Sequence, residues 1–559
     1  MRRTSEYAVL LLGAIALVAV APSMKTAAAA APIAEQPLVL LDALLWDGTG
    51  DTTRTASIAV VDGHVRSIGD EATVRAVGGA GARVLDLNGA LVLPGLRDQH
   101  VHVMDTGIPG VAAGAADPSF SANNPAQSEA LRGVILAFHT SVFARGETPE
   151  SGCERSQVTE AMKGELLTAE QIMAAQGLTA TVEAGLSDLG QLEALFELAE
   201  EGRLTMRWLP RIGAGCVEDA AALGWTTGTG NEWVRLLGVK LYADGWLGPR
   251  SAAMREAYSD RPGNQGLLFL SPAAATEAVR LADELGFNIT THGIGDAGIE
   301  TILDAYEQNG VTAGDRWQIE HAQVTDLAMI DRFAALGVIG SMQTSFATTD
   351  QRFAESALGP ERLATSYNWR TMLDRGVRLV GSTDFPVEVL APLWGVQRTV
   401  TRVEFDGFPD ADGFQPDQRL ELATTLRLLT SDAAYASLEE DDRGTIEIGR
   451  WADLTVVRED LFTLPPDCIA SATVLLTVVN GRVAFEGAQA FPPGAADCAS
   501  GAAPNGDGAV ITELAAGTPG PTPSDLGAAK DPSLVATGGG LVALSLLTLA
   551  GAYQLRRRD

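Results

Sequence analysis

The sequence predicts an α/β fold, namely a (β/α)8 TIM-like barrel combined with a small composite β-sandwich domain built from both flanks. Two observations predict this class. Between residues 93 and 436, eight strand-like apolar segments alternate with amphipathic helical segments, which indicates a parallel sheet that can close into a barrel. The flanks instead hold short strands with Asp/Gly turns, and neither flank is large enough to fold well alone.

The barrel strands are predicted from short runs rich in apolar and β-branched residues. We expect them at residues 90–102, 177–185, 204–212, 237–245, 287–296, 317–323, 338–344 and 376–386. Helical patterns such as "LGQLEALFELAEEG" and "SPAAATEAVRLADELG" lie between them. The flanks at 37–92 and 437–490 share one style of short strand, so we expect them to pair into a single domain.

The composition is that of a globular, acidic protein. Hydrophobic residues make up 46% and charged residues 20% of the 559 positions, which leaves room for a large core. The net charge of −31 argues against nucleic acid as a partner, because binding to phosphate backbones needs lysine and arginine patches.

Residues 1–30 have the three parts of a secretory signal peptide. Two arginines precede an apolar stretch from Ala8 to Ala21, and an alanine-rich exit follows it. This stretch of about 14 apolar residues is too short to cross a bilayer comfortably. We therefore expect a cleaved signal.

The C-terminal end predicts a second targeting segment. Residues 491–533 are rich in Pro, Gly, Ala and Ser, which is typical of a linker. Residues 534–559 then hold about 22 mostly apolar residues and a tail with three arginines, long enough to span a membrane with the arginines in the cytoplasm. The triple glycine, apolar segment and basic tail resemble the GlyGly-type sorting signals of Gram-negative bacteria, in which a rhomboid-like protease (rhombosortase) removes the tail.

Both ends of the chain predict one topology. We expect an exported protein of a Gram-negative bacterium, tethered to the membrane through its C-terminal segment. If a processing protease cuts that segment, the body would reach the cell surface or the medium. Without processing, the segment is a plain transmembrane anchor. The sequence leaves open whether the chain forms a homo-oligomer.

Four cysteines would lie in an oxidising compartment. They are Cys153, Cys216, Cys468 and Cys498. Three disulfide pairings are open, and the sequence does not choose among them. Free buried cysteines are the alternative.

Polar residues gather at the predicted C-terminal ends of the barrel strands, where a barrel carries its active site. Four of the six histidines fall there. His100 and His102 form an HxH pair after the first strand, and residues i and i+2 of a strand point the same way, so both imidazoles can reach one ion. The whole set is His100, His102, Lys240, His292, His321 and Asp384.

Each member of this set has a simpler explanation when taken alone. Asp384 could cap the turn that follows it, and Lys240 could be an ion-paired lysine in an apolar strand. A single histidine at a strand end more often satisfies a local hydrogen bond. Their occurrence together favours a metal site, whereas we interpret His64 and His139 as structural.

Several motifs resemble the amidohydrolase superfamily. They are "LPGLRDQHVH", "VKLYADGWLGPRSA", "SDRPGNQGLL", "THGIGD", "IEHAQ", "SMQTSFATTD" and "GSTDFPVE". More narrowly, they are similar to its third amidohydrolase family, which includes N-substituted formamide deformylases. The segment "GTIEIGRWADLTVV" resembles the closing segment of that superfamily's small domain, so the resemblance runs from about residue 37 to 488.

The resemblance implies a divalent metal centre, with two zinc ions as the default. His100, His102 and Asp384 would hold one ion, while His292 and His321 would hold the second. Asp384 would also be the catalytic residue that takes a proton from the attacking water.

The resemblance further implies that Lys240 is carboxylated by CO2 and bridges the ions, because an ammonium group cannot ligate a metal but a carbamate can. Glu183 stands where family members often carry a histidine, and it is the rival bridging ligand. Trp246 and Arg250 are candidates for the substrate-binding loop.

These features predict an exported metal-dependent amidohydrolase. It would hydrolyse a non-peptide C–N bond of a small molecule (an amide, N-acyl or N-formyl bond) by metal-activated hydroxide. A mononuclear deaminase or cyclic amidase, with Lys240 unmodified, is the near alternative. A catalytically inert surface binding module on the same fold is the alternative of another class.

Overall fold

The computed structural model describes residues 36–104, 152–385, 387–489, 498 and 511–514. The predicted signal peptide (1–30), the predicted C-terminal membrane segment (534–559) and His139 lie outside these residues. Within the described ranges, no helix is both long enough and apolar enough to cross a membrane.

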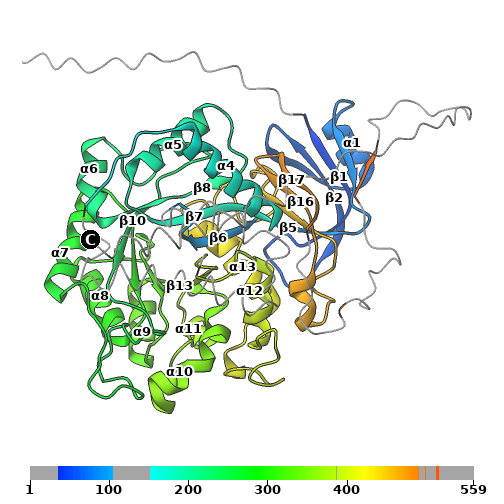
Figure 1. Ribbon diagram of the computed structural model, residues 1–559. Helices are drawn as coiled ribbons and strands as arrows, with labels where there is room; N and C mark the ends of the chain where they lie inside the picture. Colours follow the sequence, from blue (N-terminus) through cyan, green and yellow to red (C-terminus); the bar gives the residue numbers. More distant parts are fainter. Residues whose placement is uncertain (1–35, 105–151, 386, 490–497, 499–510, 515–559) are drawn as a thin grey trace, which may run out of the picture. The chain divides into compact units, whose positions relative to one another are not determined.

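Parallel strands form the predicted barrel (Figure 1). They are β6 (Leu96–Val101), β7 (Leu178–Leu186), β8 (Arg207–Trp208), β9 (Arg211–Gly213), β10 (Gly238–Tyr242), β11 (Ile289–Gly293), β12 (Gln318–His321), β13 (Ile339–Gln343) and β14 (Leu379–Ser382). They pair in the order β14-β13-β12-β11-β10-β9-β7-β6, with β8 on β7. A parallel bridge between Val101 and Phe385 joins the two end strands, so the barrel is nearly closed and the predicted fold class is confirmed.

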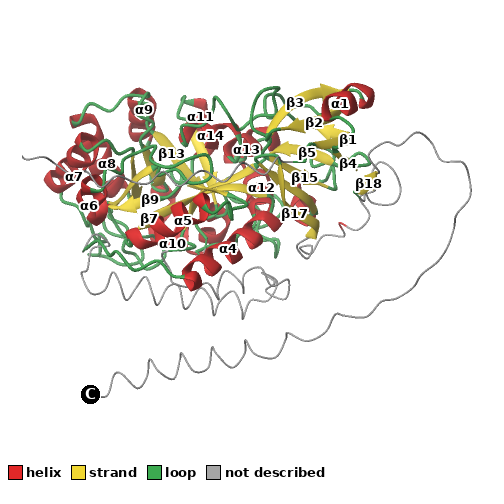
Figure 2. Cartoon of the chain, turned by 90° about the horizontal axis from the view of Figure 1, so that it is seen from above, coloured by secondary structure: helices red, strands yellow, loops and turns green. Residues whose placement is uncertain are grey.

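Helices alternate with these strands along the chain and surround them (Figure 2). They are α4 (Glu160–Ala175), α5 (Leu189–Glu200), α6 (Val217–Ala222), α7 (Pro272–Glu284), α8 (Asp296–Gln308), α9 (Leu327–Leu336), α10 (Phe346–Leu363), α11 (Trp369–Asp374), α12 (Pro392–Thr401), α13 (Leu422–Leu428) and α14 (Ser431–Ala436), with short 3-10 turns η1 (Ala214–Cys216), η2 (Pro416–Gln418) and η3 (Pro466–Ser471). Side-chain oxygens of Thr159, Asp188, Ser271 and Asp326 accept backbone N–H bonds in the first turns of α4, α5, α7 and α9, which fixes where these helices begin.

A second sheet combines strands from both flanks. It contains β1 (Leu38–Leu45), β2 (Arg54–Val61), β3 (His64–Gly69), β4 (Arg83–Asp86), β5 (Leu91–Pro94), β15 (Leu454–Val457), β16 (Val474–Val479), β17 (Arg482–Gln489) and β18 (Thr512–Leu514), and the helix α1 (Glu71–Gly78) follows β3. The order β17-β16-β15-β5-β1-β2-β3 joins the flanks through the antiparallel β5–β15 pair, and β1 also pairs with β4. Apolar side chains of both branches share one core, as expected for a composite domain.

Two predicted barrel strands are interrupted. The segment 90–102 divides at Gly95 into β5 of the second sheet and β6 of the barrel. Gly95 packs so closely on Thr179 that a Cβ atom would lie 2.3 Å from the Thr179 hydroxyl oxygen, and the Gly95 N–H donates to the Asp453 carbonyl. The segment 204–212 divides into β8 and β9 around Pro210, which has no N–H to donate.

The C-terminal interval 491–533, predicted as a linker, contains one described strand. β18 pairs antiparallel with β4 at the edge of the second sheet. Cys498, in the same interval, forms a disulfide with Cys468 of η3. These two contacts attach the described parts of the interval to the folded body.

All four cysteines form disulfides. Cys153 pairs with Cys216, and Cys468 pairs with Cys498. The structure therefore selects one of the three pairings that the sequence left open. The first disulfide joins the segment before α4 to η1, which follows barrel strand β9.

Candidate metal centre

The HxH pair lies at the C-terminal end of β6 and points to one place, as the strand periodicity predicts. The Nε2 atoms of His100 and His102 are 3.1 Å apart, and both side chains are buried. Asp98, two residues earlier, accepts bonds from the Thr383 hydroxyl at 2.6 Å and from the Thr383 N–H at 3.0 Å. This contact ties β6 to the segment after β14.

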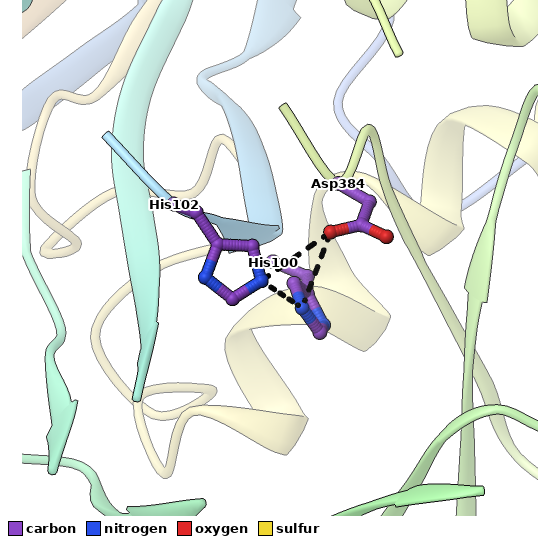
Figure 3. Close-up of side chains that lie close together, drawn as sticks. All are labelled: His100, His102 and Asp384. Carbon is purple, nitrogen blue, oxygen red and sulfur yellow. Dashed lines mark hydrogen bonds and ion pairs between the residues drawn. The ribbon is translucent and has the colours of Figure 1, made fainter. Parts of the chain in front are cut away.

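Asp384 follows β14 and completes the cluster (Figure 3). Its Oδ1 atom is 3.4 Å from His100 Nε2 and 3.5 Å from His102 Nε2. The Asp384 N–H donates to the His100 carbonyl at 2.9 Å, so the backbones of the two end strands hold this carboxylate against the histidines.

These three donors fit a divalent ion. Their ligand atoms all lie within 4.8 Å of one another. Tetrahedral zinc with bonds of about 2.0–2.1 Å needs ligand atoms about 3.3–3.4 Å apart, and the observed separations of 3.1, 3.4 and 3.5 Å bracket this value. Two imidazoles and one carboxylate are also donor types that zinc accepts.

His292 of β11 and His321 of β12 lie beside this cluster. Their ring centroids are 4.5 Å apart, and the His321 ring is 5.2 Å from the ring of His100. Lys240 of β10 is fully buried, with its Nζ atom 3.2 Å from His100 Nε2. The structure thus brings all six predicted ligands to one end of the barrel.

Hydrogen-bond acceptors orient the rings of His100, His321 and His292. His100 Nδ1 contacts Glu320 Oε2 at 2.8 Å, and His321 Nδ1 contacts Gln343 Oε1 at 2.6 Å. His292 Nε2 contacts the Gly245 carbonyl at 2.9 Å. Such contacts fix ring orientation and decide which nitrogen can serve as a ligand.

Burial controls the protonation of the cluster. Desolvation, with the charge of Lys240 and His292, holds the pKa of His100 well below its usual range, and desolvation does the same to the pKa of His321. Burial raises the pKa of Asp384 well above its usual range, against the opposing charge of Lys240. Neutral imidazoles with free lone pairs are what a metal site needs, and a cation would favour the ionised carboxylate.

The remaining predicted residues occupy distinct places. Glu183 of β7 is fully buried next to the HxH pair, and its Oε2 atom accepts the Val103 N–H at 2.9 Å. Trp246 lies in the loop after β10, where its backbone N–H donates to the Ser251 hydroxyl at 3.0 Å.

Arg250, in the same loop, has a structural contact. Its guanidinium group forms an ion pair with Asp260 at 2.5 Å and packs on Phe353 of α10, 5.4 Å from the ring centroid. These contacts of Arg250 stabilise the loop after β10 and attach it to α10.

Sequence reasoning did not single out three carboxylates around the cluster. Asp98 and Glu320 both contact His100, and Asp244 lies 3.4 Å from His292 Nε2. Asp244 accepts three backbone N–H groups, from Ala253, Ile294 and Gly295, and burial raises its pKa to about 7. In the sequence, Asp98 and Glu320 stand two positions and one position before a candidate histidine ligand, and Asp244 follows the strand that holds Lys240. An acidic residue at such a position in an apolar run is the signal that could have identified them.

The comparisons with known proteins identify the family and support the fold. A model of the amidohydrolase family matches residues 126–485, more than half of the chain. Among solved structures, an uncharacterized metal-dependent hydrolase from Pyrococcus horikoshii OT3 is similar with a TM-score of 0.63 at 21% identity, covering 77% of this chain and 99% of that one. The similarity to this solved structure shows the fold.

Two curated relatives align with less of their length. The chain is 32% identical over 257 residues to Protein LONG AFTER FAR-RED 3 of Arabidopsis thaliana, covering 45% of this chain and 43% of that protein. It is 29% identical over 229 residues to N-substituted formamide deformylase of Arthrobacter pascens, covering 40% and 41%. The alignments thus span less than half of these relatives.

Proposed function

The chain belongs to the amidohydrolase family, and from this premise we propose that it is an exported metal-dependent hydrolase of a non-peptide C–N bond. The substrate class is a small amide, N-acyl or N-formyl compound. The similarity to an N-substituted formamide deformylase supports the N-formyl group as the first to test.

The observation that carries the proposal is the convergence of His100, His102 and Asp384 from the two strands that close the barrel. Their donor atoms have the separations that a tetrahedral ion requires. The three side chains are buried, and their backbones are joined by hydrogen bonds across the barrel seam, so they are held in place before an ion binds.

We propose a second ion on His292 and His321. Zinc is the default for both positions, because imidazole and carboxylate suit it. Lys240, as a carbamate, is the proposed bridging group, since its Nζ atom already lies beside His100. Glu183 is the rival, because it is buried at the neighbouring strand end.

Asp384 has the position of a general base. When bound, the ions lower the pKa of an attacking water and polarise the substrate carbonyl. Asp384 would accept the proton of that water and pass it to the leaving nitrogen as the C–N bond breaks. Its Oδ2 atom, 4.0 Å from His321 Nδ1, lies on the side away from the HxH pair and is the oxygen available for this transfer.

Export is part of the proposal and is supported by the disulfides. Disulfides persist in oxidising compartments, and all four cysteines of the chain are paired. Membrane tethering and removal of the C-terminal segment remain predictions from the sequence, because residues 515–559 lie outside the described structure.

The proposal is tested by metal analysis and a substrate panel on one purified preparation. We expect about two zinc ions per chain and hydrolysis of N-formyl or N-acyl amines that is lost with a chelator and restored by Zn²⁺. One ion per chain with activity on cyclic amides or amino-heterocycles would favour the mononuclear alternative. A metal-loaded protein that hydrolyses none of these compounds would favour an inert binding module.

A further inference from the structure

Glu320 is a buried carboxylate under the candidate metal centre, and none of the proposed ligand roles uses it. It lies on β12, one residue before His321, and is 1% exposed. Its two oxygens have different partners: Oε2 is 2.8 Å from His100 Nδ1, and Oε1 accepts the Thr290 hydroxyl at 2.8 Å.

The first contact fixes the tautomer of His100. A carboxylate can only accept, so His100 carries its proton on Nδ1 and donates it to Glu320. The lone pair then lies on Nε2, which is the atom 3.1 Å from His102 and 3.4 Å from Asp384. An anionic acceptor also makes the imidazole a stronger metal ligand.

The second contact fixes the carboxylate itself. Thr290 lies on β11, the strand next to β12, and its hydroxyl holds the Oε1 atom in place. Arg211 of β9 supplies balancing charge inside the barrel. Its guanidinium group is buried and donates to Asn288 at 3.0 Å, and although burial lowers its pKa to about 10, it stays a cation that interacts with Glu320.

The rings of His321 and His292 have a neutral oxygen as the acceptor at the shortest distance, and the Asp244 carboxylate lies further from His292, at 3.4 Å. His321 faces the amide oxygen of Gln343, and His292 faces the carbonyl of Gly245. His100 differs from these two rings in having a carboxylate, itself held by a second residue, at 2.8 Å from Nδ1.

We propose that Glu320, braced by Thr290, is a positioning residue that sets the tautomer and basicity of His100 and thereby strengthens ion binding by His100, His102 and Asp384. This inference rests on the proposed function, because it assumes that these three residues hold an ion. The inference adds Glu320 and Thr290 to the proposed site as residues that would act through His100 and not as ligands.

The test measures Zn²⁺ affinity rather than turnover. The full chain is freed of metal, and its Zn²⁺ dissociation constant is measured by competition with a chromophoric chelator. Glu320→Gln keeps the size and removes the charge; its amide oxygen can accept from His100 Nδ1 while its NH2 group donates to the Thr290 hydroxyl, and we expect affinity to fall about 10-fold. Glu320→Ala removes the contact, and we expect a fall of about 100-fold.

Two neighbouring threonines provide a matched control. Thr290→Val removes the bond to Glu320, whereas Thr291→Val removes an equivalent buried bond to the Tyr306 hydroxyl on the other face of β11. Both variants lose one hydroxyl of a fully buried side chain, so their apo forms should lose similar thermal stability. We expect weaker Zn²⁺ binding only for Thr290→Val.

The outcomes separate the two proposals. Unchanged Zn²⁺ affinity in folded Glu320→Gln, or equal affinities of the two threonine variants, overturns the positioning role and leaves the proposed function standing. If the wild-type chain binds no divalent ion, the proposed function itself is wrong. If the Glu320 variants do not fold, the threonine pair decides.

Discussion

Left-handed backbone conformations turn two of the candidate ligands into the site. His321 has φ 71° and Asp384 has φ 59°, a region that side chains other than glycine seldom adopt. In a regular strand, His321 would point away from the face used by Glu320, because neighbouring residues alternate. The strain at these strand ends is therefore the means by which adjacent residues both reach the site.

Asp384→Asn separates ion binding from proton transfer. The amide keeps the shape and one ligand oxygen but cannot accept the proton, so metal content should survive better than turnover. We expect kcat to fall roughly 10²–10⁴-fold, the range for loss of a general base. Metal content is measured in the same sample, and an unchanged kcat in the metal-replete variant would remove Asp384 from the mechanism.

Lys240→Ala tests the bridging carbamate. Removing the side chain should lower both activity and the number of ions bound, because the proposed carbamate would offset the repulsion between two neighbouring cations. Short carboxylic acids added to the variant should restore part of both, since they can occupy the vacated volume. Lack of rescue together with loss of ions in Glu183→Gln would instead assign the bridge to Glu183.

The convergence of the candidate ligands at one end of the barrel was predictable from the sequence, while the residues that contact them were not. The HxH spacing and the positions of His292 and His321 at strand ends can be read from the sequence alone. The contacts of Glu320 with His100 and of Asp98 with Thr383 join residues 220 and 285 positions apart, so only the closed barrel brings them together.

Among elements, the positions of the barrel strands were easier to predict than the points where two of them divide. Most predicted strands match observed ones within a few residues, because short apolar runs between helices leave little choice. The divisions at Gly95 and Pro210 were not predictable from periodicity. The division at Gly95 depends on the close approach of Thr179, which is a property of the assembled sheets, whereas the division at Pro210 follows from the missing N–H of proline, which periodicity does not register.

The Cys153–Cys216 disulfide should stabilise the fold by restricting the unfolded chain. It closes 63 residues, compared with 30 for Cys468–Cys498. Replacing both cysteines of the first pair with serine should lower the free energy of unfolding by about 2–5 kcal/mol. Urea denaturation of the two double variants provides the comparison, and a larger loss for the shorter loop would contradict the chain-entropy explanation.

For the whole molecule, a buried ion network connects the barrel with the composite sheet. Glu439, after α14, forms ion pairs with Arg97 of β6 and with Arg443 at 3.0 Å. Arg443 is also 3.6 Å from Asp453, which accepts two bonds from Arg207 of β8. Because Asp453 leads into β15, the network joins residues of both domains and makes their association depend on charge.

This network predicts a loss of stability in acid. Burial alone would raise the pKa of Glu439, but Arg97 and Arg443 outweigh it and lower the pKa to about 2 from an ordinary value of 4.5. A lowered carboxyl pKa stabilises the fold fully above the unfolded value, and this contribution is lost as pH falls from about 4.5 towards 2. A shift of this size corresponds to about 3 kcal/mol.

Glu439→Gln isolates this contribution. The variant leaves Arg97 without its anion and Arg443 with Asp453 alone, so it should be several kcal/mol less stable than wild type at neutral pH, about 3–5 kcal/mol for a broken buried pair. Below pH 4.5 the unfolded wild-type chain binds a proton at Glu439, while the folded chain keeps this carboxylate ionised down to about pH 2, so the stabilising contribution shrinks; the amide of the variant does not titrate. The difference in unfolding free energy, measured by urea denaturation from pH 7 to 2.5, should therefore narrow below pH 4.5. Two curves that stay parallel over this range would show that the pKa of Glu439 is the same in the folded and unfolded chains and that acid acts elsewhere, for example on Asp453, whose pKa Arg207 and Arg443 lower against the effect of burial.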